Sequence, residues 1–140
     1  MLRLVRLLGL VLLFFSCKKT VDTSIPNVAV NESLTLAEPS NFPLTAQGGW
    51  VYHPGGYSGL VVYRRAFTGN FDDFVTYDRA CPRHYSNSCG RLNVVDDFYL
   101  VCPCDSSQWY LLNGFPEAQQ NGLLKQYSTT FTAGVIYIQN

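Results

Sequence analysis

Four cysteines and one histidine lie close together in the chain, and their side chains can do chemistry. Cys81, His84 and Cys89 occur in the stretch CPRHYSNSC, and Cys102 and Cys104 in CPC, all within 24 residues. Thiolate and imidazole groups are ligands for iron, zinc and other transition metals. Thiols can instead form disulfides, and four cysteines allow three pairings, among which the sequence alone does not decide.

Short strands and turns must position these residues. After Gln47 the chain is rich in glycine, tyrosine and β-branched residues, and no segment has a convincing helical pattern; the one candidate is a turn near 116–121. This pattern predicts an all-β sandwich or barrel, with the two cysteine stretches on loops separated by a hairpin. The predicted strand regions are 48–56, 59–67, 74–77, a hairpin over 92–102 around Asp96-Asp97, 108–116, and two strands in 123–140 around Ala133-Gly134.

The N-terminus has the features of an export signal. Arg3 and Arg6 precede an apolar run of about nine residues, which is too short to span a bilayer. The run ends in LFFSC, which resembles a bacterial lipobox, the site where a lipoprotein signal peptidase cuts before an acylated cysteine. Residues 1–16 are therefore predicted to be a lipoprotein signal peptide, and Cys17 the lipid-bearing residue. Lipid on Cys17 would hold the protein on a membrane of the cell envelope, facing the periplasm.

Residues 17–45 are rich in Thr, Ser, Asn and Pro and are predicted to be a flexible tether with one short strand at 28–30 or 33–36. The folded domain is expected over 46–140. Without Arg3 and Arg6, the mature chain keeps 8 of its 10 Lys and Arg against 10 Asp and Glu, a net charge of −2. Since nucleic-acid binding requires a concentrated basic face, no nucleic-acid partner is expected.

From about Gly48 to its end, the chain resembles a Rieske-type [2Fe–2S] domain. FVTYDRAC is similar to the family's approach to its first loop, CPCDSSQWYLLNGFP to its second loop with the strand and turn that follow, and LLKQYSTTFTAGVIYI to its closing hairpin. In that family two cysteines bind one iron and two histidines the other, and two further cysteines join the loops. The resemblance implies a Rieske-like antiparallel sandwich or barrel with a two-loop cluster-binding-type subdomain.

The resemblance assigns a place to each of the four cysteines. Cys81 and Cys102 take the iron-ligand places, and Cys89 and Cys104 the places of the disulfide. Two cysteines that bind one iron have neighbouring sulfurs, and neighbouring thiols in an exported protein can oxidise to a disulfide. If iron is absent, the resemblance thus implies two disulfides, Cys81–Cys102 and Cys89–Cys104.

The chain departs from the family at both histidine places. His84 follows Cys81 with Cys-x-x-His instead of Cys-x-His spacing, and Asp105 stands where the second histidine is expected. An aspartate is a harder ligand than imidazole and adds negative charge to the site. Both changes oppose a standard Rieske centre.

These considerations predict a non-enzymatic binding or structural module, lipid-anchored, stapled by two disulfides and without a cofactor. Its protein partner is unknown, and one expectation is an accessory subunit of an envelope oxidoreductase. The alternative is an electron-transfer protein that binds a non-standard [2Fe–2S] cluster through Cys81, His84, Cys102 and Asp105. A zinc site formed by Cys81, His84, Cys102 and Cys104 is a further, weaker alternative.

Overall fold

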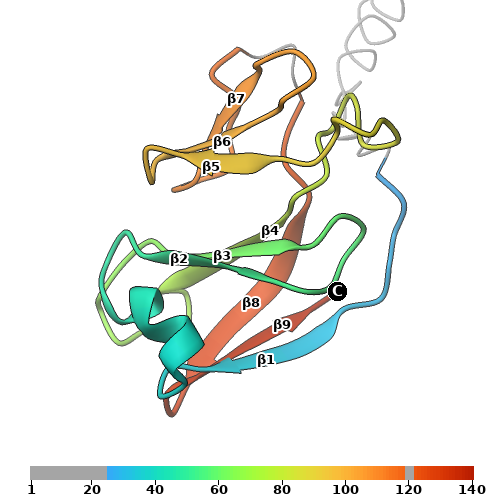
Figure 1. Ribbon diagram of the computed structural model, residues 1–140. Coiled ribbons are helices and arrows are strands. Elements are labelled where there is room, and N and C mark those ends of the chain that lie inside the picture. The colour runs from blue at the N-terminus through green and yellow to red at the C-terminus, as the bar shows by residue number, and fades with distance from the viewer. Residues whose placement is uncertain (1–24, 119–121) are drawn as a thin grey trace, which may run out of the picture.

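Two antiparallel sheets form the domain (Figure 1). The computed structural model describes residues 25–118 and 122–140, so the predicted signal peptide and Cys17 lie outside the described residues. The larger sheet has the strand order β1-β9-β8-β4-β3-β2, and the smaller sheet the order β5-β6-β7. The strands are β1 (Asn31–Thr35), β2 (Trp50–His53), β3 (Leu60–Arg64), β4 (Phe74–Asp78), β5 (Asn93–Val95), β6 (Tyr99–Val101), β7 (Gln108–Tyr110), β8 (Gln126–Thr132) and β9 (Val135–Gln139).

The two faces of the larger sheet belong to two separate hydrophobic clusters. Successive strand residues point to opposite faces, so in β3 Leu60 and Val62 join one cluster with β1 and β9, while Val61 joins the other. The second cluster fills the space between the two sheets, where Val61 and Tyr77 meet Trp109 of β7. Because β3 and β4 are covered on both faces, nearly all of their residues are buried, including Thr76 and Asp78 of β4.

The segment before residue 46 differs from the prediction. β1 pairs with β9 over its whole length. It overlaps the predicted strand region 33–36 and begins two residues before it. Pro39–Thr45 then forms a short 3₁₀ helix, η1, which the sequence pattern did not reveal. Leu34 and Leu44 are both buried in the first cluster. The expected tether over 17–45 is therefore wrong for residues 31–45, because their apolar side chains complete the core and β1 covers the edge of β9.

The carboxylate of Asp78 joins three parts of the larger sheet. It is fully buried at the end of β4 and accepts hydrogen bonds from the backbone nitrogens of Tyr57 (2.7 Å), Ser58 (3.0 Å) and Ala80 (2.9 Å). The phenol of Tyr127 in β8 donates a fourth hydrogen bond of 2.8 Å, and burial followed by this bond raises the pKa of Tyr127. Asp78 thereby fixes both the turn after β2 and the start of the chain that leaves β4.

Gly56 lies directly against this network. It has a φ of +64°, and a Cβ at this position would come within 2.5 Å of the Asp78 carboxylate and 2.8 Å of the Tyr127 hydroxyl. Only glycine combines this backbone conformation with so close an approach.

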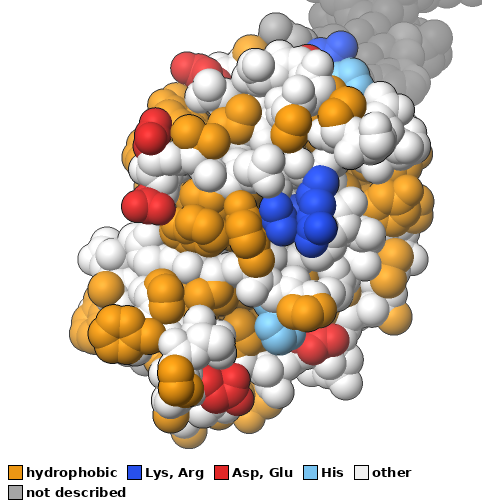
Figure 2. Space-filling view, viewed as in Figure 1, with side chains coloured by type: hydrophobic (Ala, Val, Ile, Leu, Met, Phe, Trp, Pro, Cys, Tyr) orange, Lys and Arg blue, Asp and Glu red, His pale blue; other side chains and the backbone are white. Residues whose placement is uncertain are grey.

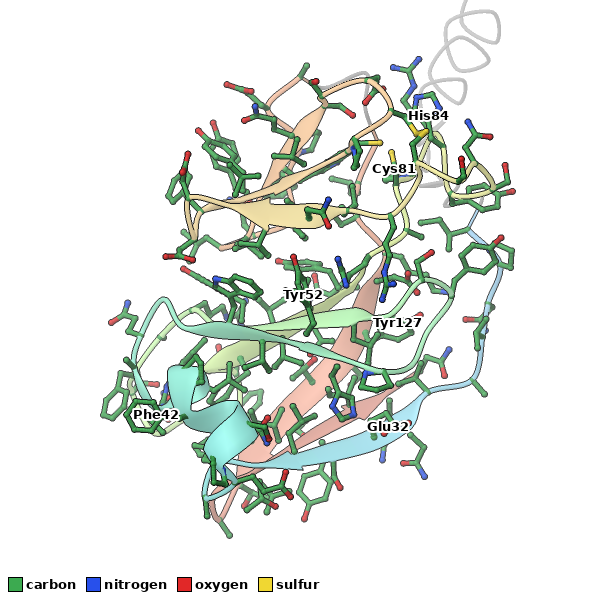
Figure 3. All side chains as sticks on the ribbon, viewed as in Figure 1. Glu32, Phe42, Tyr52, Cys81, His84 and Tyr127 are labelled. Atoms are coloured by element: carbon green, nitrogen blue, oxygen red, sulfur yellow. A yellow bond between two sulfur atoms is a disulfide. The ribbon has the colours of Figure 1, made fainter. Side chains whose placement is uncertain are left out.

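Polar contacts attach the smaller sheet to edge strand β2. The Trp50 indole donates to Asp97 (2.7 Å), and the backbone nitrogen of Val94 donates to the Tyr52 hydroxyl (2.8 Å). The Arg79 guanidinium stacks 3.5 Å above the Tyr52 ring, which Figure 3 shows between the two sheets. These contacts and the second hydrophobic cluster fix the smaller sheet on the larger one.

The predicted all-β architecture is confirmed, and each strand region predicted after residue 46 contains an observed strand. Asp96 and Asp97 form the hairpin turn as predicted, with φ of 53° and 54°. Among the described residues, no helix is long and apolar enough to cross a membrane.

Replacing Asp78 tests the role of its carboxylate. We expect Asp78→Asn to lower the free energy of unfolding by about 3 kcal/mol or more, because the amide nitrogen cannot accept hydrogen bonds from the buried donors. Urea denaturation followed by tryptophan fluorescence measures the change. Asp72→Asn is the control, since its exposed ion pair with Arg65 contributes less than about 1 kcal/mol. Equal losses for the two variants would contradict the assignment.

Candidate functional site

Loop one, residues 79–92 between β4 and β5, carries Cys81, His84 and Cys89 on a chain of consecutive turns. The nitrogens of His84, Asn87 and Gly90 each donate to the carbonyl three residues earlier, and the Cys81 nitrogen donates to the Gly90 carbonyl (2.8 Å). A Cβ on Gly90 would lie 1.8 Å from the His84 carbonyl oxygen, so only glycine fits there. The turns hold His84 at the outer end of the loop.

Loop two, residues 102–107 between β6 and β7, is a tighter turn. The Ser106 nitrogen donates to the Cys102 carbonyl (2.8 Å), and the Cys102 nitrogen donates to the Ser107 carbonyl (2.9 Å). Ser106 adopts a φ of +61°, which is uncommon for a residue other than glycine. The two loops lie at the same end of the domain, which we call the two-loop end, and Figure 3 places Cys81 and His84 there.

A disulfide joins the two loops. Cys89 of loop one and Cys104 of loop two are bonded, with their Cα atoms 5.2 Å apart. This is the pair that the resemblance assigned to the disulfide, and the structure confirms it. A cross-link that closes a loop of this size typically contributes about 3 kcal/mol to stability.

The second predicted disulfide is not formed. Cys81 and Cys102 are free thiols, both fully buried in the second hydrophobic cluster. Their side chains are in hydrogen-bonding contact, and burial together with this contact raises the pKa of Cys102 to about 12. The predicted proximity of the two sulfurs is thus correct, but the predicted bond between them is wrong. The apolar surroundings hold the two thiols in contact without a covalent link.

His84 and Asp105 bind each other across the two loops. The imidazole Nε2 lies 2.9 Å from the Asp105 Oδ2, and their side chains are 27% and 28% exposed. Asp105 Oδ1 accepts two further hydrogen bonds from Ser107, one from its nitrogen at 3.0 Å and one from its hydroxyl at 2.5 Å. The Ser107 hydroxyl is the largest cause that lowers the pKa of Asp105, to about 2, and His84 lowers it as well.

A cavity of about 530 Å³ opens beside this pair. Polar side chains from both loops line most of it, so it offers hydrogen-bonding atoms to a ligand or partner group. The lining residues are Arg83, His84, Asp105, Ser106, Ser107, Gln108, Glu117 and Ala118.

Comparisons with known proteins identify the fold. No protein-family model and no curated protein matches the chain. Among solved structures, the cyanobacterial plasma membrane Rieske protein PetC3 of Synechocystis PCC 6803 is similar with a TM-score of 0.52 and 16% identity, covering 81% of this chain and 100% of that one. The chain has a Rieske-like fold. At this identity the similarity is evidence for the fold alone.

Two further solved structures resemble the chain more weakly. The ferredoxin of carbazole 1,9a-dioxygenase from Nocardioides aromaticivorans IC177 has a TM-score of 0.48 and 16% identity, covering 81% of this chain and 98% of that one. The E. coli protein NirD has a TM-score of 0.47 and 12% identity, with the same coverages of 81% and 98%.

As they lie in this structure, the side chains at the two-loop end of this Rieske-like fold are not arranged as a set of cluster ligands. The thiols of Cys81 and Cys102 face each other inside the core, while His84 and Asp105 lie at the surface and occupy each other's polar atoms. Within residues 25–118 and 122–140, no three His, Cys, Asp or Glu side chains are grouped so that they could hold a metal ion. The weaker zinc alternative loses Cys104 to the disulfide.

His53 lies outside both loops, as the sequence indicates, and pairs with Glu32 of β1 at 3.1 Å. Ser107 is a contributor to the site that the sequence analysis did not single out. A serine two residues after an aspartate commonly donates to that carboxylate. The DSS sequence at 105–107 was therefore a usable signal.

The state of the four thiols can be measured by alkylation. We expect Cys81 and Cys102 to resist alkylation in the folded protein, because both are buried and the pKa of Cys102 is about 12. After denaturation without reductant both should react, while Cys89 and Cys104 should not, as mass spectrometry of the peptides will show. If none of the four reacts after denaturation, a second disulfide exists and the description of this site is wrong.

Titration of Asp105 tests the bonds that Ser107 donates. We expect Ser107→Ala to raise the pKa of Asp105 from about 2 toward the ordinary value of about 3.9, because the strongest donor is removed. Because folding lowers this pKa, the stability contributed by the ionised carboxylate is present above about pH 4 and is lost as the pH falls toward 2. Carbon-13 NMR of the carboxyl group measures the midpoint.

Ser86→Ala, at an exposed serine of loop one, is the matched control and should leave the Asp105 midpoint unchanged. A wild-type midpoint near the ordinary aspartate value, or the same shift in both variants, would show that Ser107 does not set the charge state of the pair.

Proposed function

We propose that this protein is a non-enzymatic binding or structural module with a Rieske-like fold, held on the periplasmic side of a cell-envelope membrane by lipid on Cys17. In this proposal the two-loop end carries no iron–sulfur cluster. This end is a rigid surface that binds a partner protein. The chain would thereby act as an accessory subunit of an envelope complex.

The contact between His84 and Asp105 is the observation that carries this proposal. The resemblance places these two residues at the ligand positions of one iron, yet each is the hydrogen-bonding partner of the other. Ligation would first have to break this pair and the bonds from Ser107 to Asp105. The pair instead joins loop one to loop two, close to the Cys89–Cys104 disulfide that performs the same task covalently.

The preserved rigidity of the two-loop end supports a binding role. Cross-links between loops keep surface groups in place before a partner arrives, which reduces the entropy lost on binding. The polar cavity beside His84 and Asp105 offers donors and acceptors from both loops and from Glu117. Among the described residues that line the cavity, the Ser107 hydroxyl donates to Asp105 and not to His84, so no serine–histidine pair is formed there.

One observation favours the alternative of a non-standard [2Fe–2S] centre. Cys81 and Cys102 are reduced and adjacent, as two cysteines that bind one iron would be. The alternative and the proposal therefore predict different iron contents for the same protein.

Anaerobic reconstitution distinguishes them. We expect the mature protein, incubated with ferrous iron and sulfide under reductant and then desalted, to show no visible [2Fe–2S] absorption and no EPR signal after reduction. Its bound iron should equal that of the Cys81→Ser/Cys102→Ser double variant, because without a complete set of ligands the metal binds only adventitiously.

The opposite result is equally clear. Two irons and two sulfides per chain, lost in the double variant but retained in the control variant Ser86→Ala, would show that the site assembles a cluster. The chain would then be an electron-transfer protein.

A further inference from the structure

We propose that the outer face of the smaller sheet binds a partner protein, through a segment that presents arginine side chains beside apolar ones. The inference goes beyond the proposed function, because it concerns a surface outside the two-loop end and states the chemistry of the partner. It does not depend on whether the two-loop end holds a cluster, so the two proposals can fail separately.

A row of apolar side chains crosses the outer face of the smaller sheet. Val95 of β5 lies opposite Tyr99 of β6, and Tyr99 lies opposite Tyr110 of β7. The Tyr110 nitrogen donates to the Phe115 carbonyl (3.0 Å), which places Phe115 beside Tyr110 and extends the row beyond β7. Trp109, the neighbour of Tyr110, is buried in the second cluster, so the row lies on the opposite face, toward solvent.

Aromatic rings make this row a continuous surface. The centroid of the Phe98 ring lies 4.8 Å from that of Tyr99 and 5.6 Å from that of Tyr110, and the two tyrosine rings are 5.2 Å apart. The exposed fractions of Val95, Phe98 and Phe115 are 41%, 49% and 55%. Single exposed apolar residues are ordinary, whereas contiguous ones mark interaction sites, and aromatic residues are enriched in protein interfaces. The name aromatic face is used below for Val95, Phe98, Tyr99, Tyr110 and Phe115.

The charges around the aromatic face are negative. Residues 92–118 contain four acidic residues and no Lys or Arg. In the described part of the chain, no ion pair joins Asp96, Asp97 or Glu117 to a Lys, Arg or His. Desolvation, a neighbouring tyrosine and the charge of Glu117 raise the pKa of Tyr99, so Glu117 lies near the rings. Figure 2 shows acidic side chains next to hydrophobic ones along the left edge of the upper part of the domain, where Figure 1 places the smaller sheet.

Exposed rings and uncompensated carboxylates together favour arginine as the group that binds here. A guanidinium can stack on an aromatic ring while it pairs with a carboxylate. The chain contains this arrangement itself, since the Arg64 guanidinium lies 4.0 Å from the centroid of the Phe67 ring and 3.7 Å from Asp73.

Other occupants fit the aromatic face less well. An anionic lipid, a nucleic acid or the same face of a second copy would meet like charge. A neutral oligosaccharide can stack on the rings but leaves the carboxylates without a cation, so it is the competing occupant that the experiment must distinguish.

Hydroxyl-radical footprinting with synthetic probes tests the inference. The purified protein, in nonionic detergent, is labelled alone, with a peptide of alternating arginine and leucine, with the same peptide carrying glutamate for arginine, and with cellohexaose. We expect the arginine peptide to reduce the labelling of Phe98, Tyr99 and Tyr110 by about threefold or more, and this protection to weaken as the salt concentration rises. The glutamate peptide and the sugar should not protect these rings. Labelling of Phe42, which Figure 3 places far from the smaller sheet, should stay unchanged.

Matched variants test the two parts of the recognition. Phe98→Leu keeps an apolar side chain but removes the ring, and Asp96→Asn/Glu117→Gln keeps the shapes but removes two charges. Each should weaken binding of the arginine peptide by about fivefold or more in calorimetric titration, because it removes either the stacking surface or the opposite charge. Phe42→Leu and Asp72→Asn are the controls and should bind as the wild type does. Far-UV circular dichroism verifies that every variant is folded.

The results that overturn the inference are distinct. They are equal protection by the arginine and glutamate peptides, protection by cellohexaose alone, and no protection by any probe. Protection that grows with the concentration of the protein itself would assign the face to a second copy and would also overturn it. None of these results concerns iron content, which tests the proposed function separately.

Discussion

The buried carboxylate of Asp78 is the constraint on which the site depends. It sits where β4 ends and loop one begins, and its four donors come from the turn after β2, from Ala80 and from Tyr127 in β8. A buried charge is tolerated only when its lone pairs are satisfied, so these segments can adopt only one arrangement together. Ala80 directly precedes Cys81, and the direction in which loop one leaves the sheet is set by this network.

Three contacts join loop one to loop two, and they lie at different depths below the surface. The thiols of Cys81 and Cys102 lie deepest, inside the apolar cluster between the sheets. The Cys89–Cys104 disulfide links the loops nearer the surface, and the pair formed by His84 and Asp105 lies half-exposed beside the polar cavity. These three contacts join the two loops to each other at this end of the domain.

The alternation of apolar residues predicted the strands, the Asp96-Asp97 hairpin turn and the all-β class, because these depend on local sequence. The resemblance predicted the Cys89–Cys104 pair and the closeness of Cys81 and Cys102. Whether Cys81 and Cys102 are bonded or free could not be predicted, since this depends on burial by segments distant in sequence. For the same reason the sequence does not place residues 31–45 in the folded domain: only β9 and the first cluster make their few apolar residues part of the core.

The central claim is that this Rieske-like fold works without a cluster. Native mass spectrometry of the protein, isolated anaerobically from the membranes of the cells that produce it, tests this claim without reconstitution. The account predicts the mass of the acylated chain with one disulfide and two free thiols. A mass greater by two irons and two sulfides, lost when Cys81 and Cys102 are replaced by serine, would contradict it.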